Sequence, residues 1–337
     1  MDAPPINPNP VQNYKDRRIG LVAFGIVIIG VGCVVALFLP LSFIGQFLGA
    51  KSMGVPPNYQ VLAQTLLMYG LLALALIWLG AGSIRAGRWD KALLVIFTSS
   101  WLVIGFFTVI AFLMVMPKAI AGLTEAQPLP QVARTLMLLL PFVMLTSAFI
   151  LLPLGLLLFY SSSHVKATCE ARDPVERWTD RTPLPVIGAG LWVAFGALML
   201  LSMPLSARGV IPAFGRILSG ASGSVVLVTM AAIWFYCAWA IYRLQPAGWW
   251  LLIATIVLSV VSNVMTFPKI DIGEMYRLMG YPDVQIERML RFNFVNGTIL
   301  TICSVGSSLL ALGYLIWLKR FFPRSTQSGA GSLAAVS

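Results

Sequence analysis

The residues able to perform catalysis are few and widely spaced in this 337-residue sequence. Its single histidine, His164, follows the serines Ser161, Ser162 and Ser163 in a loop between apolar stretches. A catalytic histidine acquires its role from a neighbouring nucleophile, carboxylate or metal, and no such pattern surrounds this one. We therefore interpret His164 as a solvated loop residue.

Two other patterns resemble sites without meeting their requirements. The stretch from Gly220 to Gly223 lacks both the spacing and the strand-to-helix context of a nucleophile elbow. Four acidic residues suggest a metal cluster, but they alternate with arginines on segments of helical spacing, which favours a solvated, salt-bridged face; they are Asp271, Glu274, Asp283 and Glu287. We assign no catalytic, cofactor-binding or metal-ligating residue and expect a protein that is not an enzyme.

The four cysteines form no recognisable framework. Three lie in apolar stretches and one in a loop, and no CxxC pair marks a zinc site or a redox dithiol. We expect all of them to be unpaired thiols: Cys33, Cys169, Cys237 and Cys303.

Composition identifies the solvent that surrounds the chain. The sequence is 58% hydrophobic and 10% charged, with a mean hydropathy of +0.87, whereas a soluble domain carries about 25% charged residues. A soluble fold of this size has a large exterior that must be polar. The surface must therefore face lipid.

Eight uncharged stretches are long enough to cross a bilayer, which takes about 20 apolar residues as a helix. With no water available inside hydrocarbon, the backbone of such stretches must be helical. The predicted fold is an all-α polytopic membrane protein, with spans near Ile19 to Leu39, Leu62 to Ser83, Ala92 to Met116, Leu136 to Tyr160, Val186 to Met203, Gly223 to Tyr242, Leu251 to Phe267 and Val295 to Leu318.

Basic residues predict the orientation and one class of partner. Of the 23 lysines and arginines, 14 fall on the side that holds both termini, which places the termini in the cytoplasm. The net charge of +11 is concentrated at span ends, and no basic run with interleaved aromatics indicates nucleic acid. We expect anionic lipid headgroups to be its counterions at the cytoplasmic face, beside a possible protein partner.

An internal duplication is visible at an offset of 164 residues. Asn9 to Arg17 matches Asp173 to Arg181, and Pro40-Leu41-Ser42 recurs as Pro204-Leu205-Ser206. A weaker echo pairs Ala86-Gly87 with Ala247-Gly248. Four spans return the chain to its starting side, so the halves are predicted to be parallel four-helix repeats.

This duplication predicts the domain organisation. Residues 9–165 form the first four-helix repeat and 166–324 the second, between disordered tails at 1–8 and 325–337.

Two loop segments have patterns of their own. From Asp173, the order of an acidic residue, a proline and Glu176 predicts a short helix with a capping box, supported by an ion pair between Asp173 and Arg177. Apolar residues at helical spacing between Lys269 and Phe292 predict two short external helices. These helices either cover the span ends or form a lid or partner-docking surface.

No ionisable residue is visible inside the predicted spans, which argues against proton coupling. Small and polar residues recur on one face of the first and eighth spans, as in helix packing; they are Gly25, Gly32, Ala36, Gly297, Thr301, Ser304 and Ser308. A solute pathway would use the same residue types and stays open. Asn263 requires a partner, and Pro141 and Pro153 should kink the fourth span.

The segment from Arg177 to Val186 resembles one found in bacterial multispanning membrane proteins of unassigned function, and Asp16-Arg17-Arg18 opens the first span similarly. The resemblance implies a bacterial inner-membrane setting and brings no site residues. Our leading hypothesis is a non-enzymatic accessory or assembly component. The alternative is a transporter or channel for a small, weakly polar or lipid-like solute.

Overall fold

Long helices make up almost all of the chain in this computed structural model, which describes residues 15–53, 59–126, 130–291 and 297–322. The helices are α1 (Arg18–Met53), α2 (Tyr59–Arg85), α3 (Arg88–Ala126), α4 (Gln131–Thr146), the π-helix η1 (Ser147–Leu151), α5 (Leu152–Tyr160), α6 (Ser163–Arg172), α7 (Trp178–Arg181), α8 (Leu184–Ser206), α9 (Gly220–Tyr242), α10 (Pro246–Thr266), α11 (Ile272–Leu278), α12 (Asp283–Arg291), α13 (Gly297–Leu318) and the 3₁₀ helix η2 (Lys319–Phe321). The predicted tails at 1–8 and 325–337 lie outside the described residues.

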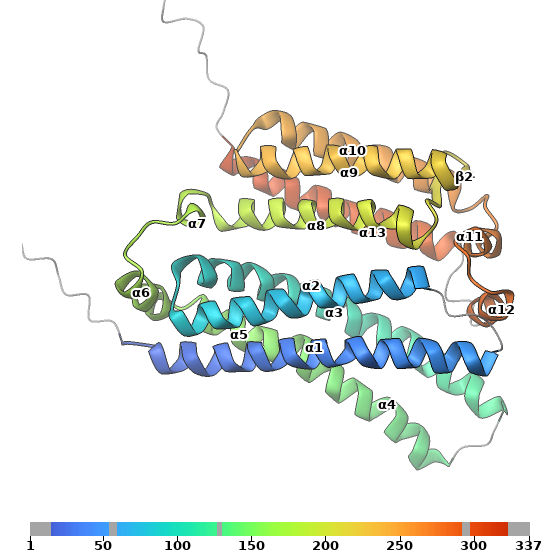
Figure 1. Ribbon diagram of the computed structural model, residues 1–337, viewed down its shortest axis with the longest axis horizontal. Coiled ribbons are helices and arrows are strands. Elements are labelled where there is room, and N and C mark those ends of the chain that lie inside the picture. The colour runs from blue at the N-terminus through green and yellow to red at the C-terminus, as the bar shows by residue number, and fades with distance from the viewer. Residues whose placement is uncertain (1–14, 54–58, 127–129, 292–296, 323–337) are drawn as a thin grey trace, which may run out of the picture. The chain divides into compact units, whose positions relative to one another are not determined.

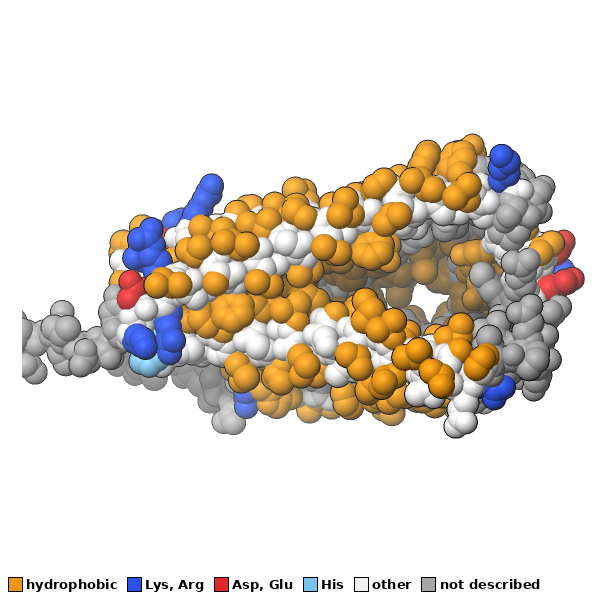
Figure 2. Space-filling view, turned by 90° about the horizontal axis from the view of Figure 1, so that it is seen from below, with side chains coloured by type: hydrophobic (Ala, Val, Ile, Leu, Met, Phe, Trp, Pro, Cys, Tyr) orange, Lys and Arg blue, Asp and Glu red, His pale blue; other side chains and the backbone are white. Residues whose placement is uncertain are grey.

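Eight segments of the described chain are helical, long enough and apolar enough to cross a membrane, which confirms the all-α polytopic fold. They are Arg18–Lys51, Leu62–Arg85, Arg88–Pro117, Gln131–Tyr160, Leu184–Ser206, Gly220–Tyr242, Pro246–Thr266 and Gly297–Phe321. Figure 2 shows one face of the protein, where hydrophobic side chains cover the helices and charged ones gather near their ends.

The third span begins earlier than predicted. Its helix starts at Arg88, so Asp90 and Lys91 lie in the first turn of a span that sequence reasoning began at Ala92. The expectation that no ionisable residue lies within a span is therefore wrong near the ends of the candidate spans, as Arg134 in the fourth span also shows. The first turn of a helix carries partial positive charge, which offsets part of the cost of burying the Asp90 carboxylate.

Contacts divide the chain into two compact units. The first comprises Met1–Phe38 and Tyr69–Arg181, and the second comprises Leu39–Met68 and Thr182–Ser337. The division passes through α1 and α2, and the change near residue 181 falls after α7. The repeat boundaries at 9–165 and 166–324 stay a prediction.

The core of the first unit forms where α1, α2, α3, α5 and α6 meet. Leu21, Leu94, Leu156 and Tyr160 are among its fully buried side chains. Ser83 on α2 donates a hydrogen bond to the carbonyl of Leu21 on α1 at 2.9 Å, and its hydroxyl lies 2.6 Å from that of Tyr160 on α5. These bonds join three spans through buried polar atoms that lipid could not satisfy.

The second unit is built from four antiparallel helices (Figure 1). Helix α8 packs on α9, α9 on α10 and α10 on α13, and side chains of all four share one core. Its core includes Cys237, Ile241, Trp249 and Leu318. The indole of Trp249 is 5% exposed and donates to the carbonyl of Leu315 at 2.8 Å. Trp249 therefore belongs to the helix interface, while Trp250 beside it is exposed, as an aromatic belt requires.

Outside its spans, the second unit carries a small apolar cluster that sequence reasoning found only in part. A two-stranded antiparallel hairpin, β1 (Ile211–Ala213) and β2 (Arg216–Leu218), pairs Ile211 with Leu218 and was not predicted. The two predicted short helices are confirmed as α11 and α12. Val210 beside the hairpin packs with Ile272 and Met275 of α11, all buried.

The hairpin tip is fastened to the end of α10. The backbone amides of Phe214 and Gly215 donate to the hydroxyls of Ser262 and Thr266, at 3.1 and 2.8 Å. Gly215 has a φ of 81°, a left-handed conformation that favours glycine. A short hairpin is thereby ordered without a larger sheet.

Candidate functional site

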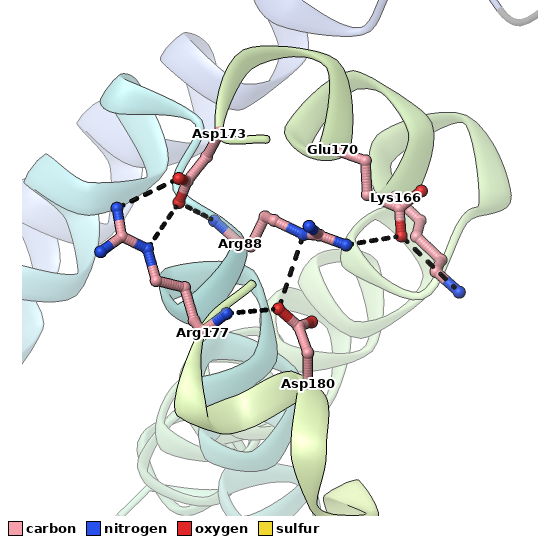
Figure 3. A network of polar contacts seen from close by, with 6 residues as sticks. All are labelled: Arg88, Lys166, Glu170, Asp173, Arg177 and Asp180. Atoms are coloured by element: carbon pink, nitrogen blue, oxygen red, sulfur yellow. Dashed lines mark hydrogen bonds and ion pairs between the residues drawn. The ribbon is translucent and has the colours of Figure 1, made fainter. Parts of the chain in front are cut away.

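A network of polar contacts lies at one end of the first unit, around the start of α3. We call it the polar cap and define it as Arg88, Lys166, Glu170, Asp173, Arg177 and Asp180 (Figure 3). The largely buried Arg88 side chain reaches Glu170 on α6 at 3.5 Å and Asp180 on α7 at 3.6 Å. Lys166 pairs with the same glutamate at 3.8 Å. Three cations face three carboxylates, so the polar cap neutralises its own charge.

Asp173 corrects the predicted helix. It follows the last residue of α6 as its C-cap, and the next helix begins only at Trp178. Its carboxylate accepts hydrogen bonds from the Arg88 amide at 3.3 Å and from the Arg177 guanidinium at 3.2 and 3.1 Å. Asp173 therefore caps α3, a helix distant in sequence, instead of starting one of its own, because an unpaired N–H at the start of α3 needs an acceptor.

The predicted ion pair between Asp173 and Arg177 is confirmed at 3.1 Å, although no helix joins these residues. Asp180, the third residue of α7, accepts from the backbone amide of Arg177 at 2.9 Å, as the acidic residue of a capping box does. Arg172 pairs with Asp16 at 3.6 Å. These contacts connect the segment after the fourth span to the start of α3 and to the segment before α1.

Acid should loosen the polar cap. The hydrogen bond from Arg177 holds the pKa of Asp173 below its usual range, which is about 3.9 in an unfolded chain. The stabilisation is thus present above that pH and is lost as the pH falls through the lower, folded-state pKa. We expect Asp173→Asn to lower the melting temperature of the purified protein at pH 7 and the difference from wild type to disappear in strong acid.

The matched control for that measurement is Asp283→Asn. It removes the exposed ion pair between Arg277 and Asp283, which should contribute little at any pH. A gap between wild type and Asp173→Asn that persists unchanged in strong acid would contradict the assigned role of Asp173.

A second feature beside the polar cap is the buried carboxylate of Asp90. This residue is 2% exposed, and its Oδ1 has no hydrogen-bond partner among the described residues. A Cβ at Gly82, in the last turns of α2, or at Gly87, before α3, would overlap this carboxylate. The two glycines make room for Asp90 where α2 turns back into α3.

The turn between α9 and α10 has the same backbone conformation as the turn between α2 and α3. The two turns differ in which flanking position holds the glycine. Ala86 and Leu244, the residues that turn the chain, have φ values of 58° and 56°. Gly82 lies four residues before the first turn residue, and Asp90 lies four residues after it. Ala240 and Gly248 hold the corresponding positions around the second turn, and a Cβ on Gly248 would overlap Ala240. The sequence match pairs Ala86 with Ala247, whereas the backbone conformation pairs Ala86 with Leu244, three residues earlier.

The residues that first suggested chemistry are not brought together. His164 is half-buried on α6, and its backbone carbonyl accepts from Thr168 at 2.8 Å. Asp271 caps α11 by accepting from the amide of Gly273, and Arg277 pairs with Asp283 at 2.8 Å, which supports a salt-bridged face. Within the described ranges, no three histidine, cysteine or acidic side chains converge as metal ligands do.

The cysteine prediction is confirmed, since all four are free thiols. Cys169 on α6 is buried, and this burial raises the pKa of its thiol to about 11. The protonated thiol is a poor nucleophile at neutral pH. Cys169 is therefore part of the core of the first unit.

The small-residue seams pack helices together. Gly25 on α1 and Gly80 on α2 face each other, so a Cβ on Gly25 would lie 2.9 Å from the carbonyl of Gly80. In the second unit, a Cβ on Gly297 would overlap the carbonyl of Phe267. Close backbone approach at small residues is typical of membrane helix contacts.

Asn263 has the partner that the sequence required. Its amide donates to the hydroxyl of Ser304 at 2.8 Å, joining α10 to α13. We expect Asn263→Leu to destabilise the second unit by about 0.6 kcal/mol and by about 1.7 at most, as measured for such bonds in membranes. Thermal unfolding in detergent micelles tests this, with Ser259→Ala as a control because the Ser259 hydroxyl donates to the carbonyl of Thr255 within its own helix. A larger loss in the control than in Asn263→Leu would contradict the assignment.

The fourth span is irregular between its two prolines. Pro141 lies inside α4, Pro153 lies in the first turn of α5, and the π-helical turn η1 separates them. The Thr146 hydroxyl at this turn is buried and has no hydrogen-bond partner among the described residues. A π-turn realigns the helical hydrogen bonds and is frequent at functional sites.

Eight apolar spans with charged residues gathered at their ends define an integral membrane protein of the all-α polytopic class. The sequence matches no protein-family model and is significantly similar to no curated protein and to no solved structure.

Proposed function

We propose that the protein is a non-enzymatic accessory or assembly component of a larger complex in a bacterial inner membrane. One observation carries this proposal: α4 is 16 residues long and buries none of its described side chains. Since membrane helices associate through packing, the surface of α4 is open to a helix of another protein. The polar cap, which neutralises its own charge, supports a structural role for the end of this unit.

The test is capture from native membranes. We expect the full chain, extracted with its surrounding lipid, to bring down one membrane protein in stoichiometric amount. Replacing Leu140 and Met144, both 64% exposed on α4, with alanine should release that partner. Replacing Ile26, 58% exposed on α1, should not. Recovery of lipid alone would contradict the accessory role.

The π-turn favours one second candidate, a transporter or channel for a weakly polar or lipid-like solute. A buried hydroxyl without a partner at an irregular turn is where a passing polar group would bind. Flux of a fluorescent lipid analogue in proteoliposomes tests this. Thr146→Val should reduce the flux, whereas Thr108→Val should not, because the Thr108 hydroxyl already donates to Ile104 within its helix. Absence of flux in the wild type rejects the candidate.

The proposed orientation places both termini in the cytoplasm, on the basis of the lysine and arginine excess. It also predicts that the hairpin tip at Gly215 lies outside. A cysteine introduced at Gly215 should react with an impermeant maleimide in intact cells, and one introduced at Ser337 should react only after lysis. The reverse pattern would invert the proposed topology.

A duplicated four-helix origin stays part of the proposal. The matching turns at Ala86 and Leu244 support it, because a left-handed conformation at a residue other than glycine is uncommon.

A further inference from the structure

A group of cations in the second unit is held by aromatic rings, and no ion pair joins these cations to a carboxylate of the described residues. We call it the basic aromatic cluster and define it as Lys319, Arg320, Trp249, Trp250, Trp317 and Phe321. The Lys319 ammonium lies 5.2 Å from the ring centre of Trp249 and 5.5 Å from that of Trp250. The Arg320 guanidinium lies 3.9 Å from the ring of Trp317 and 4.7 Å from that of Phe321.

These contacts fix the cations in place without neutralising them. A cation over an aromatic ring is attracted by the ring quadrupole, but it keeps its full charge. In the polar cap of the first unit, by contrast, each cation has a carboxylate within 3.8 Å or less. Lys319 and Arg320 are both exposed, so their charge is available to a ligand.

The acidic residues of the second unit are all placed away from the basic aromatic cluster in the sequence. From Thr182 onward the sequence contains four acidic residues, Asp271, Glu274, Asp283 and Glu287. All four belong to the segment of α11 and α12, between the C-terminal end of α10 and the N-terminal end of α13. The cluster lies at the opposite ends of these two spans, where Trp249 in the first turns of α10 bonds to Leu315 near the end of α13.

The position of the basic aromatic cluster at the end of a span indicates which anion it would bind. Lys319 and Arg320 follow the last residue of α13, at the C-terminal end of the eighth candidate span, and Trp250 and Trp317 beside them are 59% and 42% exposed. Exposed indoles at span ends occupy the level of the lipid headgroups. The anions concentrated at that level are lipid phosphates, which basic residues attract.

We propose that the basic aromatic cluster binds the phosphate of an anionic phospholipid headgroup. Lys319 and Arg320, adjacent at the end of α13, supply two positive charges to the phosphate, and the indoles of Trp250 and Trp317 pack against the glycerol region of the same lipid. The binding goes beyond the accessory role and does not depend on it.

Mass spectrometry of the intact protein with its retained phospholipids tests the proposal. The protein is purified in mild detergent, supplied with equal amounts of phosphatidylglycerol and phosphatidylcholine, and weighed with what it keeps. We expect preferential retention of phosphatidylglycerol, reduced about fivefold for each charge lost in Lys319→Gln and Arg320→Gln. Lys319→Arg should keep the preference.

The controls separate this site from general surface charge and from misfolding. Arg277→Gln removes an exposed cation that pairs with Asp283 and should leave retention unchanged, while melting temperatures verify that each variant is folded. Equal retention in wild type and in the folded double variant Lys319→Gln, Arg320→Gln would overturn the proposal. Displacement of the lipid by inorganic phosphate at an equal concentration would also overturn the assignment to a lipid, whereas persistence of the lipid supports it.

Discussion

Replacing Gly82 with alanine should destabilise the protein by about 3 kcal/mol, at the upper end of the usual cost of overpacking a core. The added Cβ would overlap the carboxylate of Asp90, which is enclosed by Gly87 on the other side. Because Asp90 is 2% exposed, it has no solvent to move into. Thermal unfolding in detergent measures the loss.

The second unit shows how the loss should be repaired. There the same turn accommodates Ala240 by placing Gly248 where the first unit has Asp90. The double variant Gly82→Ala, Asp90→Gly copies that arrangement and should recover most of the stability lost in Gly82→Ala. Gly30→Ala is the control, because a Cβ at Gly30 meets nothing within 4 Å. If the double variant unfolds at or below the temperature of Gly82→Ala, the overlap with Asp90 is not the cause.

Replacing Gly105 with alanine should have an effect of similar size in the middle of the membrane. A Cβ at Gly105 on α3 would overlap the backbone carbonyl of Phe149 in the π-turn η1. A backbone atom inside a helix cannot turn away as a flexible side chain can, so α3 and η1 would have to separate. We expect a loss of about 3 kcal/mol.

Gly155→Ala is the matched control for Gly105→Ala. It lies in α5, a few residues beyond the π-turn of the same span, and its Cβ would meet nothing within 4 Å. We expect unchanged or slightly higher stability, since alanine favours a helix more than glycine does. Similar melting temperatures for the two variants would show that α3 does not pack closely on the π-turn.

The spans were predictable because the constraint behind them is simple. A backbone in hydrocarbon must satisfy its own hydrogen bonds, so uncharged length alone located all eight. The seams at Gly25 and Gly297 and the need of Asn263 for a partner were predictable for a related reason. Small or polar residues on an apolar helix have few uses other than contact with another helix.

Apart from the ion pair between Asp173 and Arg177, the polar cap was not predictable, because the contacts of Arg88 join residues far apart in the sequence. Asp173 has the local pattern of a helix N-cap, yet its carboxylate serves the amide of Arg88. The burial of Asp90 depends on Gly82 and Gly87 lying against it, and no local sequence pattern predicts these close contacts. The pairing of Ile211 with Leu218 is similarly hidden, since three-residue strands are too short to show alternation.

The apolar cluster of Val210, Ile272 and Met275 lies outside the candidate spans, and we expect it to border on water. Water drives the burial of these side chains, whereas the spans are stabilised by packing and internal hydrogen bonds within the bilayer. Urea weakens the stabilisation that comes from burial away from water, because it solvates exposed apolar and peptide groups. This end of the second unit should therefore melt at moderate chaotrope concentrations while the helices in the bilayer persist, which gives the protein two separable unfolding transitions.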